Sequence, residues 1–103
     1  MYILPHLPFL IYTIMTFNNK EVELKYSIRA MMMYENITNS SFNPKNLTDI
    51  LTFFYCVVVS SMKDYDYSFE QFIDELDNEP SKLEELTNWM NGNISNQNTF
   101  KKN

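Results

Sequence analysis

The sequence predicts a small α+β domain dominated by helices, with an N-terminal β-hairpin packed against three to four short helices and a flexible C-terminal tail. Polar and apolar residues alternate early in the chain, apolar residues recur at three- and four-residue spacing later, and the end is polar and rich in asparagine. A chain of 103 residues suffices for one domain with a modest core. We expect that domain over residues 15–90, with an N-terminal extension at 1–14 and a polar flexible tail at 91–103.

The hairpin is predicted over residues 11–26. Its first half, residues 11–17, is rich in β-branched and aromatic side chains, and Asn18-Asn19 is a plausible tight turn. The returning half alternates, with Val22, Leu24 and Tyr26 on its apolar face. A hairpin alone is marginally stable in water, so this face needs helices against it. Met15 lies near the start of the hairpin, so translation that begins at Met15, without residues 1–14, is an alternative.

The first helix is predicted over residues 28–36 and carries three consecutive methionines, Met31 to Met33. Ser27 precedes it and is well placed to cap it, because a serine hydroxyl accepts a hydrogen bond from an otherwise unpaired backbone N–H. Three consecutive helical residues cannot all point into one core. Part of this adaptable apolar surface is therefore expected to face outward or toward a partner.

The second helix is predicted over residues 45–62, with Pro44 in its entry turn. Its spacing predicts a core stripe made of Leu47, Ile50, Leu51, Phe54, Tyr55 and Val58. Further apolar residues extend around the helix, so it is expected to be central or covered in part by a partner. The β-branched run 57–59 also permits a strand.

Two more helices are predicted after a loop at residues 64–67. Ser68 and Gln71 form a capping-box pattern that opens the third helix. A break at residues 78–80 precedes the fourth, which is expected to end near Met90. Either Ser81 or Asn78 is a candidate cap for this last helix.

Composition excludes several classes of function. Gly92 is the only glycine, which argues against a glycine-rich phosphate cradle. The net charge is −5, and residues 64–85 hold nine acidic residues against the single base Lys82, so nucleic acid is not an expected partner. No segment predicts a membrane span or a signal peptide.

Catalytic and metal chemistry are also not expected. Cys56 lies in an apolar run, far along the chain from the only histidine, His6, and is interpreted as a buried structural thiol. One cysteine and one histidine cannot build a zinc centre. A calcium loop that begins at Asp64 would place Phe69 where a glycine is usual. We therefore predict no enzyme activity, no cofactor and no metal.

The carboxylates of residues 70, 74 and 77 are a further candidate group, because paired carboxylates can serve acid–base catalysis. Neither a histidine nor a buried cationic partner is expected beside them. A solvated helix surface is the preferred interpretation. The surplus of aromatic and methionine residues instead leaves two alternatives, a densely packed core or an exposed groove for a helical partner. The first candidates for partner contact are Met31, Met32, Met33, Phe53 and Trp89.

Residues 15–90 resemble a tail assembly chaperone of long-tailed bacteriophages or prophages. The segments that carry the resemblance are the hairpin "NNKEVELKYS", the helix "IRAMMMYENIT", the apolar helix "LTDILTFFYCVVVSS" and the acidic "YSFEQFIDELDNEPSKLEELTNWM". The family usually has a glycine after "ENIT", where this chain has Asn39. Asparagine also tolerates left-handed backbone, so this departure is mild.

The resemblance implies a non-enzymatic role in viral tail assembly. Such a chaperone binds the helical tape measure protein in the host bacterial cytoplasm and is displaced as tail tube subunits polymerise. It acts in several copies, so a homo-oligomer is expected, and it is absent from the mature virion. Two alternatives remain: a structural tail completion or head–tail connector subunit, which would persist in purified particles, and a small regulator of a host protein.

Overall fold

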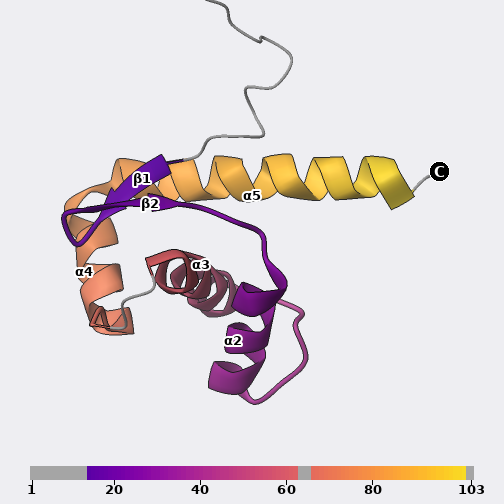
Figure 1. Cartoon of the computed structure of the whole chain (residues 1–103), viewed down its shortest axis with the longest axis horizontal. Helices are drawn as coiled ribbons and strands as arrows, with labels where there is room; N and C mark the ends of the chain where they lie inside the picture. Colours follow the sequence, from indigo (N-terminus) through magenta and orange to yellow (C-terminus); the bar gives the residue numbers. More distant parts are fainter. Residues whose placement is uncertain (1–13, 63–65, 102–103) are drawn as a thin grey trace, which may run out of the picture.

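The computed structural model describes residues 14–62 and 66–101. A two-stranded antiparallel hairpin is followed by helices, which confirms the α+β, helix-dominated class. The elements are β1 (Ile14–Phe17), β2 (Lys20–Glu23), α2 (Ile28–Thr38), α3 (Leu47–Met62), α4 (Phe69–Asn78) and α5 (Pro80–Lys101). Figure 1 shows α3 at the centre, seen nearly end-on, with α2 and α4 on either side and the hairpin and α5 along one edge.

The hairpin turns at Asn18 and Asn19, as predicted. Their φ angles are 55° and 61°, and asparagine tolerates this left-handed region better than most residues. Met15 pairs with Val22, and both side chains are buried. The β2 ladder ends at Glu23, earlier than the predicted end of the strand, and residues 11–13 lie outside the described residues.

Helix α2 begins at Ile28, as predicted, but ends at Thr38, two residues beyond its predicted end at residue 36. The Ser27 hydroxyl accepts the Ala30 N–H at 3.0 Å, which confirms the N-cap. Asn39 closes the helix in left-handed backbone, with φ 58° and ψ 37°, and its N–H donates to the Glu35 carbonyl. The loop beyond is tied back by Glu35, whose carboxylate accepts the Phe42 N–H at 2.8 Å.

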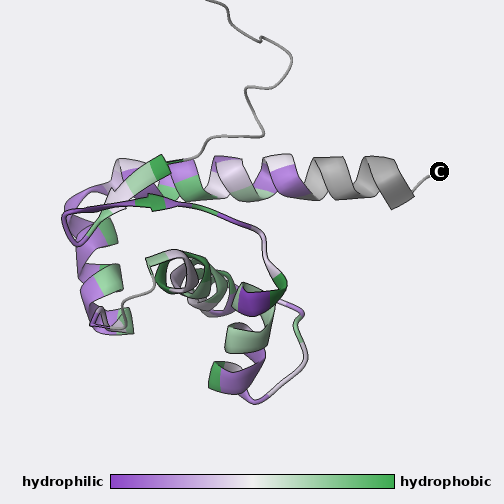
Figure 2. Cartoon of the chain, in the orientation of Figure 1, coloured by the Kyte–Doolittle hydropathy of each residue, from purple (hydrophilic) through white to green (hydrophobic). Residues whose placement is uncertain are grey.

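Helix α3 begins at Leu47, so Pro44 lies before the helix and the predicted entry turn is wrong. Asn46 caps it instead, because its side-chain oxygen accepts the Asp49 N–H at 2.9 Å. The predicted stripe is also incomplete: Leu47 is 63% exposed, whereas Thr52, Phe53, Phe54, Cys56, Val57, Val58 and Val59 are buried. The alternative strand at 57–59 does not form. Figure 2 shows apolar residues over most of α3, as a central helix requires.

Two aromatic groups pack on opposite faces of α3, centred on Phe53 and Tyr55. Rings near Phe53 have centroids 4.8 to 6.4 Å apart and belong to Tyr26, Tyr34, Phe42, Phe53 and Trp89. Rings near Tyr55 belong to Phe17, Tyr55, Tyr67, Phe69 and Phe72. Residues two apart on a helix point in nearly opposite directions, so α3 joins both halves of the core.

Helices α4 and α5 meet at a break near Glu79, as predicted. The capping box is present: the Ser68 hydroxyl accepts the Gln71 N–H, and the Gln71 side chain accepts the Ser68 N–H. Asn78 ends α4 and Ser81 lies inside the first turn of α5, so neither occupies the cap position that was expected. Helix α5 runs on to Lys101, well past the predicted end near Met90, since no proline interrupts it.

Candidate interaction surface

The most distinctive surface of the described chain is an apolar stripe on α2. Ile28 is 72% exposed, Met32 58% and Ile37 53%. Residues four apart lie on the same side of a helix, so Ile28 adjoins Met32, and Met33 adjoins Ile37. The two pairs lie on either side of Arg29 and Asn36 and together span about half of the helix circumference. We call Ile28, Met32, Met33 and Ile37 the α2 stripe. Ala30 and Tyr34 hold α2 to the core because both are buried, and Met31 and Met33 pack partly against the same core.

A shallow apolar hollow of 470 Å³ lies along this stripe. It is lined by Ile28, Arg29, Met32, Met33 and Asn36, all of them on α2. A single helix therefore supplies both the exposed apolar side chains and the hollow. Such a surface can receive an apolar side chain of another protein, and it provides no nucleophile–base pair or anion cradle.

A second hollow of 330 Å³ shares Arg29 with the first. We call it the polar hollow, because every residue that lines it is polar or charged, and it lies where the segment before α2 meets the last turns of α3. Its lining residues are Glu23, Lys25, Ser27, Arg29, Ser60 and Ser61. Apolar and polar hollows thus adjoin at one side chain, Arg29.

The structure separates the five predicted contact residues into two groups. Met31, Met32 and Met33 follow one another on α2; Met32 is exposed, and the other two are partly buried against the core. Phe53 is fully buried and Trp89 is 9% exposed, so both are core residues and offer no free surface. Their aromatic neighbours explain this: the Phe53 and Trp89 rings lie 5.5 and 6.2 Å from Tyr26.

Ile28, Ile37 and Arg29 belong to this surface but were not among the predicted contacts. The sequence does contain a pattern that indicates Ile28 and Ile37, because both residues continue the methionine run at helical spacing. That spacing does not show which side of the helix faces α3. Only the burial of Ala30 and Tyr34 decides it.

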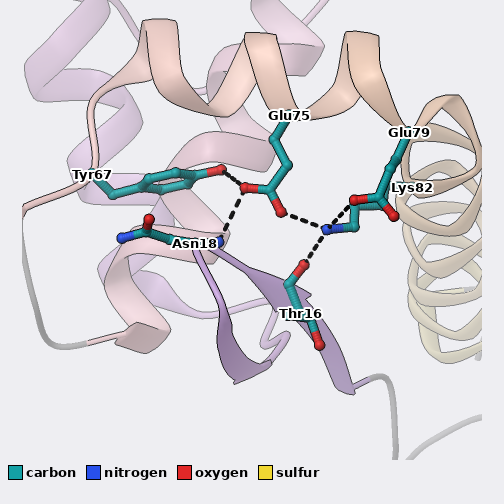
Figure 3. A network of polar contacts seen from close by, with 6 residues as sticks. All are labelled: Thr16, Asn18, Tyr67, Glu75, Glu79 and Lys82. Carbon is teal, nitrogen blue, oxygen red and sulfur yellow. Dashed lines mark hydrogen bonds and ion pairs between the residues drawn. The ribbon is translucent and has the colours of Figure 1, made fainter.

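A polar network joins the hairpin to α4 and α5 (Figure 3). Glu75 is its centre: its carboxylate accepts bonds from the Tyr67 hydroxyl at 2.5 Å, the Asn18 N–H at 3.0 Å and the Lys82 ammonium at 2.5 Å. Lys82 also donates to the Thr16 carbonyl at 2.6 Å and pairs with Glu79 at 3.2 Å. The network ties β1, the hairpin turn and both helices together.

Hydrogen bonds within this network favour the charged forms of Glu75 and Lys82. Burial raises the pKa of Glu75, but the bonds from Lys82, Tyr67 and Asn18 outweigh it, so the carboxyl pKa falls below its ordinary value. Burial lowers the pKa of Lys82, yet its bonds to Glu75 and Glu79 raise it overall. Burial, and then the bond to Glu75, raises the pKa of Tyr67, which stays a donor. Because Glu75 is already bonded to Lys82, Tyr67 and Asn18, the arrangement favours a structural role for this carboxylate over a role as a catalytic base.

The remaining chemical candidates have structural roles. Cys56 is fully buried, and burial raises the pKa of its thiol to about 12, so it is a weak nucleophile at neutral pH. Ser68 caps α4 and Glu75 binds Lys82, so neither side chain is available as a calcium ligand. Asp64, the first residue of the calcium loop considered above, lies outside the described residues. Within residues 14–62 and 66–101, no group of three acidic, histidine or cysteine side chains is arranged to hold a metal.

No known protein family, curated protein or solved structure matches the chain. Among the described residues, none of the helices combines the length and the apolar character that crossing a bilayer requires.

Proposed function

We propose that this chain is a non-enzymatic assembly chaperone that holds a helical segment of another protein on the α2 stripe. The exposure of Ile28, Met32 and Ile37 on one short helix is the observation that carries the proposal. The sequence resemblance supplies the partner, the tape measure protein of a long-tailed phage.

The fold does not require Ile28, Met32 and Ile37 to be apolar, because all three side chains are exposed. The core is formed without them, whereas Ala30 and Tyr34 are buried and Met33 packs partly against the core. Fully burying a large apolar side chain is worth about 1.5–3 kcal/mol, so covering even part of the stripe would favour association. Methionine adapts its shape to different neighbours, which suits a chaperone that receives many non-identical helical segments.

The charge of the chain supports the same role. Helix α4 and the first turns of helix α5 carry more acidic than basic residues, and the whole chain has a net charge of −5. Net charge far from zero helps to keep a protein and its complexes in solution. From the resemblance, we also propose action in the host bacterial cytoplasm, in several copies, and no place in the mature virion.

The direct test is co-expression with the tape measure protein encoded in the same genome. Affinity-tagged chain should co-purify that protein and raise its soluble fraction. Met32→Asp places a charge in the middle of the α2 stripe and should lower the recovered partner at least about tenfold, as expected for a central contact. Ile14→Asp is the matched control, because Ile14 is similarly exposed, at 55%, but lies on the hairpin.

Three outcomes distinguish the alternatives. Failure of the wild-type chain to co-purify or solubilise the tape measure protein refutes the chaperone proposal. If Met32→Asp and Ile14→Asp lower the amount of recovered tape measure protein equally, the assignment of the binding surface to α2 is refuted. Recovery of the chain from purified particles would favour a structural tail completion or head–tail connector subunit instead.

A further inference from the structure

Arg29 stands at the boundary between the two hollows beside α2. It lies three residues before Met32 and four before Met33, so its stem borders the apolar stripe. The same residue lines the polar hollow with Lys25 and Ser27. A partner seated on the stripe would therefore place its edge next to this guanidinium.

The side chains that line the polar hollow have a net positive charge, although the chain as a whole is acidic. Its charged side chains are Glu23, Lys25 and Arg29, and their sum is one positive charge, against −5 for the whole chain. Among the described residues, neither Lys25 nor Arg29 forms an ion pair. Both are exposed, as is Glu23 on the same side.

We propose that the helical partner carries an aspartate or glutamate beside its apolar stripe, and that this carboxylate binds in the polar hollow at Arg29 and Lys25. The inference rests on the proposed function and specifies the chemistry of the partner. Arginine offers five N–H donors in a planar fork that fits a carboxylate. A charge at the rim of an apolar contact fixes the register and orientation of the bound helix.

The Ser27 hydroxyl in the hollow suits the same ligand. Ser60 already donates its hydrogen to the Val57 carbonyl, whereas the Ser27 oxygen accepts the Ala30 N–H. The Ser27 oxygen acts there as an acceptor, so its own hydrogen remains to donate. A basic partner would meet only Glu23 as a counter-charge and would be repelled by two cations.

The test uses overlapping peptides of the tape measure protein, fluorescently labelled, and measures their affinity for the full chain by anisotropy. Peptides that bind should carry an acidic residue flanking their apolar stripe. Arg29→Glu should weaken them about tenfold, because a like charge replaces an opposite one at the contact. Lys45→Glu makes the same charge change outside both hollows and should leave the affinity within about twofold. Replacing the peptide's acidic residue by glutamine should abolish the effect of Arg29→Glu.

The outcomes separate this inference from the proposed function. Equal weakening of acidic and glutamine peptides by Arg29→Glu would overturn the carboxylate contact, since only the stem of Arg29 would then matter. Unchanged affinity in Arg29→Glu, with loss in Met32→Asp, overturns the inference and keeps the proposed function. Unchanged affinity in Met32→Asp, or no bound peptide at all, overturns both. The emission of the only tryptophan, Trp89, reports that each variant is folded.

Discussion

The carboxylate of Glu75 lies 2.5 Å from the ammonium of Lys82, and this pair connects α4 to α5 across the break at Glu79. Both side chains are largely buried, at 19% and 12% exposure. Lys82 reaches on to the Thr16 carbonyl and lies 5.0 Å from the centre of the Phe17 ring. The hairpin is therefore held to the helices by charged groups as well as by its apolar face.

Glu75→Gln should destabilise the fold by about 1–3 kcal/mol, because bonds to a charged group are lost and the partly buried Lys82 loses its main counter-charge. Chemical denaturation followed by Trp89 fluorescence measures the change. Asp74→Asn removes the same charge from an exposed neighbour on α4 and should shift the stability by no more than about 0.5 kcal/mol. Equal effects in both variants would mean that net charge, and not the network, is responsible.

The contribution of Glu75 should depend on pH in the acid range. Its folded pKa lies below the ordinary value of 4.5, so the stabilisation is complete above that pH and disappears as the pH falls through the folded pKa. The stability difference between wild type and Glu75→Gln should thus narrow below about pH 4.5. Denaturation curves of both proteins from pH 3 to pH 7 measure it. A difference that stays constant across that range would show that Glu75 does not titrate in this way.

Asn39→Ala should destabilise the chain by about 1 kcal/mol, whereas Asn39→Gly should be neutral or slightly stabilising. Asn39 ends α2 with φ 58°, a conformation that costs an alanine about 1–2 kcal/mol and a glycine almost nothing. Thermal denaturation monitored by circular dichroism gives the comparison. Similar losses in both variants would indicate that the asparagine side chain matters more than its backbone.

Cys56 should resist thiol reagents in the folded protein. Its side chain is fully buried and its pKa is raised to about 12, so reaction requires unfolding. At pH 8, the labelling rate should rise on the order of a thousandfold or more between buffer and denaturant, in line with ordinary domain stabilities. Fast labelling without denaturant would show that α3 opens readily and would contradict its central place.

Local interactions explain the parts of the fold that the sequence predicts well. Ser27, Ser68 and the Asn18-Asn19 turn act on neighbours two or three residues away, so their roles are visible without a tertiary structure. The central place of α3 was one of two predicted alternatives, since a helix that is apolar all round must be covered. Its buried face was predicted incompletely, because Phe53, Val57 and Val59 lie outside the predicted stripe and are also buried.

The candidate surface depended on contacts between distant parts of the chain. The sequence by itself determined that α2 carries more apolar side chains than one face can bury, and it located Met31 to Met33. Tertiary packing decided that Met32 stays outside while Phe53 and Trp89 are enclosed around Tyr26. It also decided that Glu75 meets Lys82 and the hairpin. Spacing along a helix reveals which residues share a side, but only the neighbouring elements determine which side is covered.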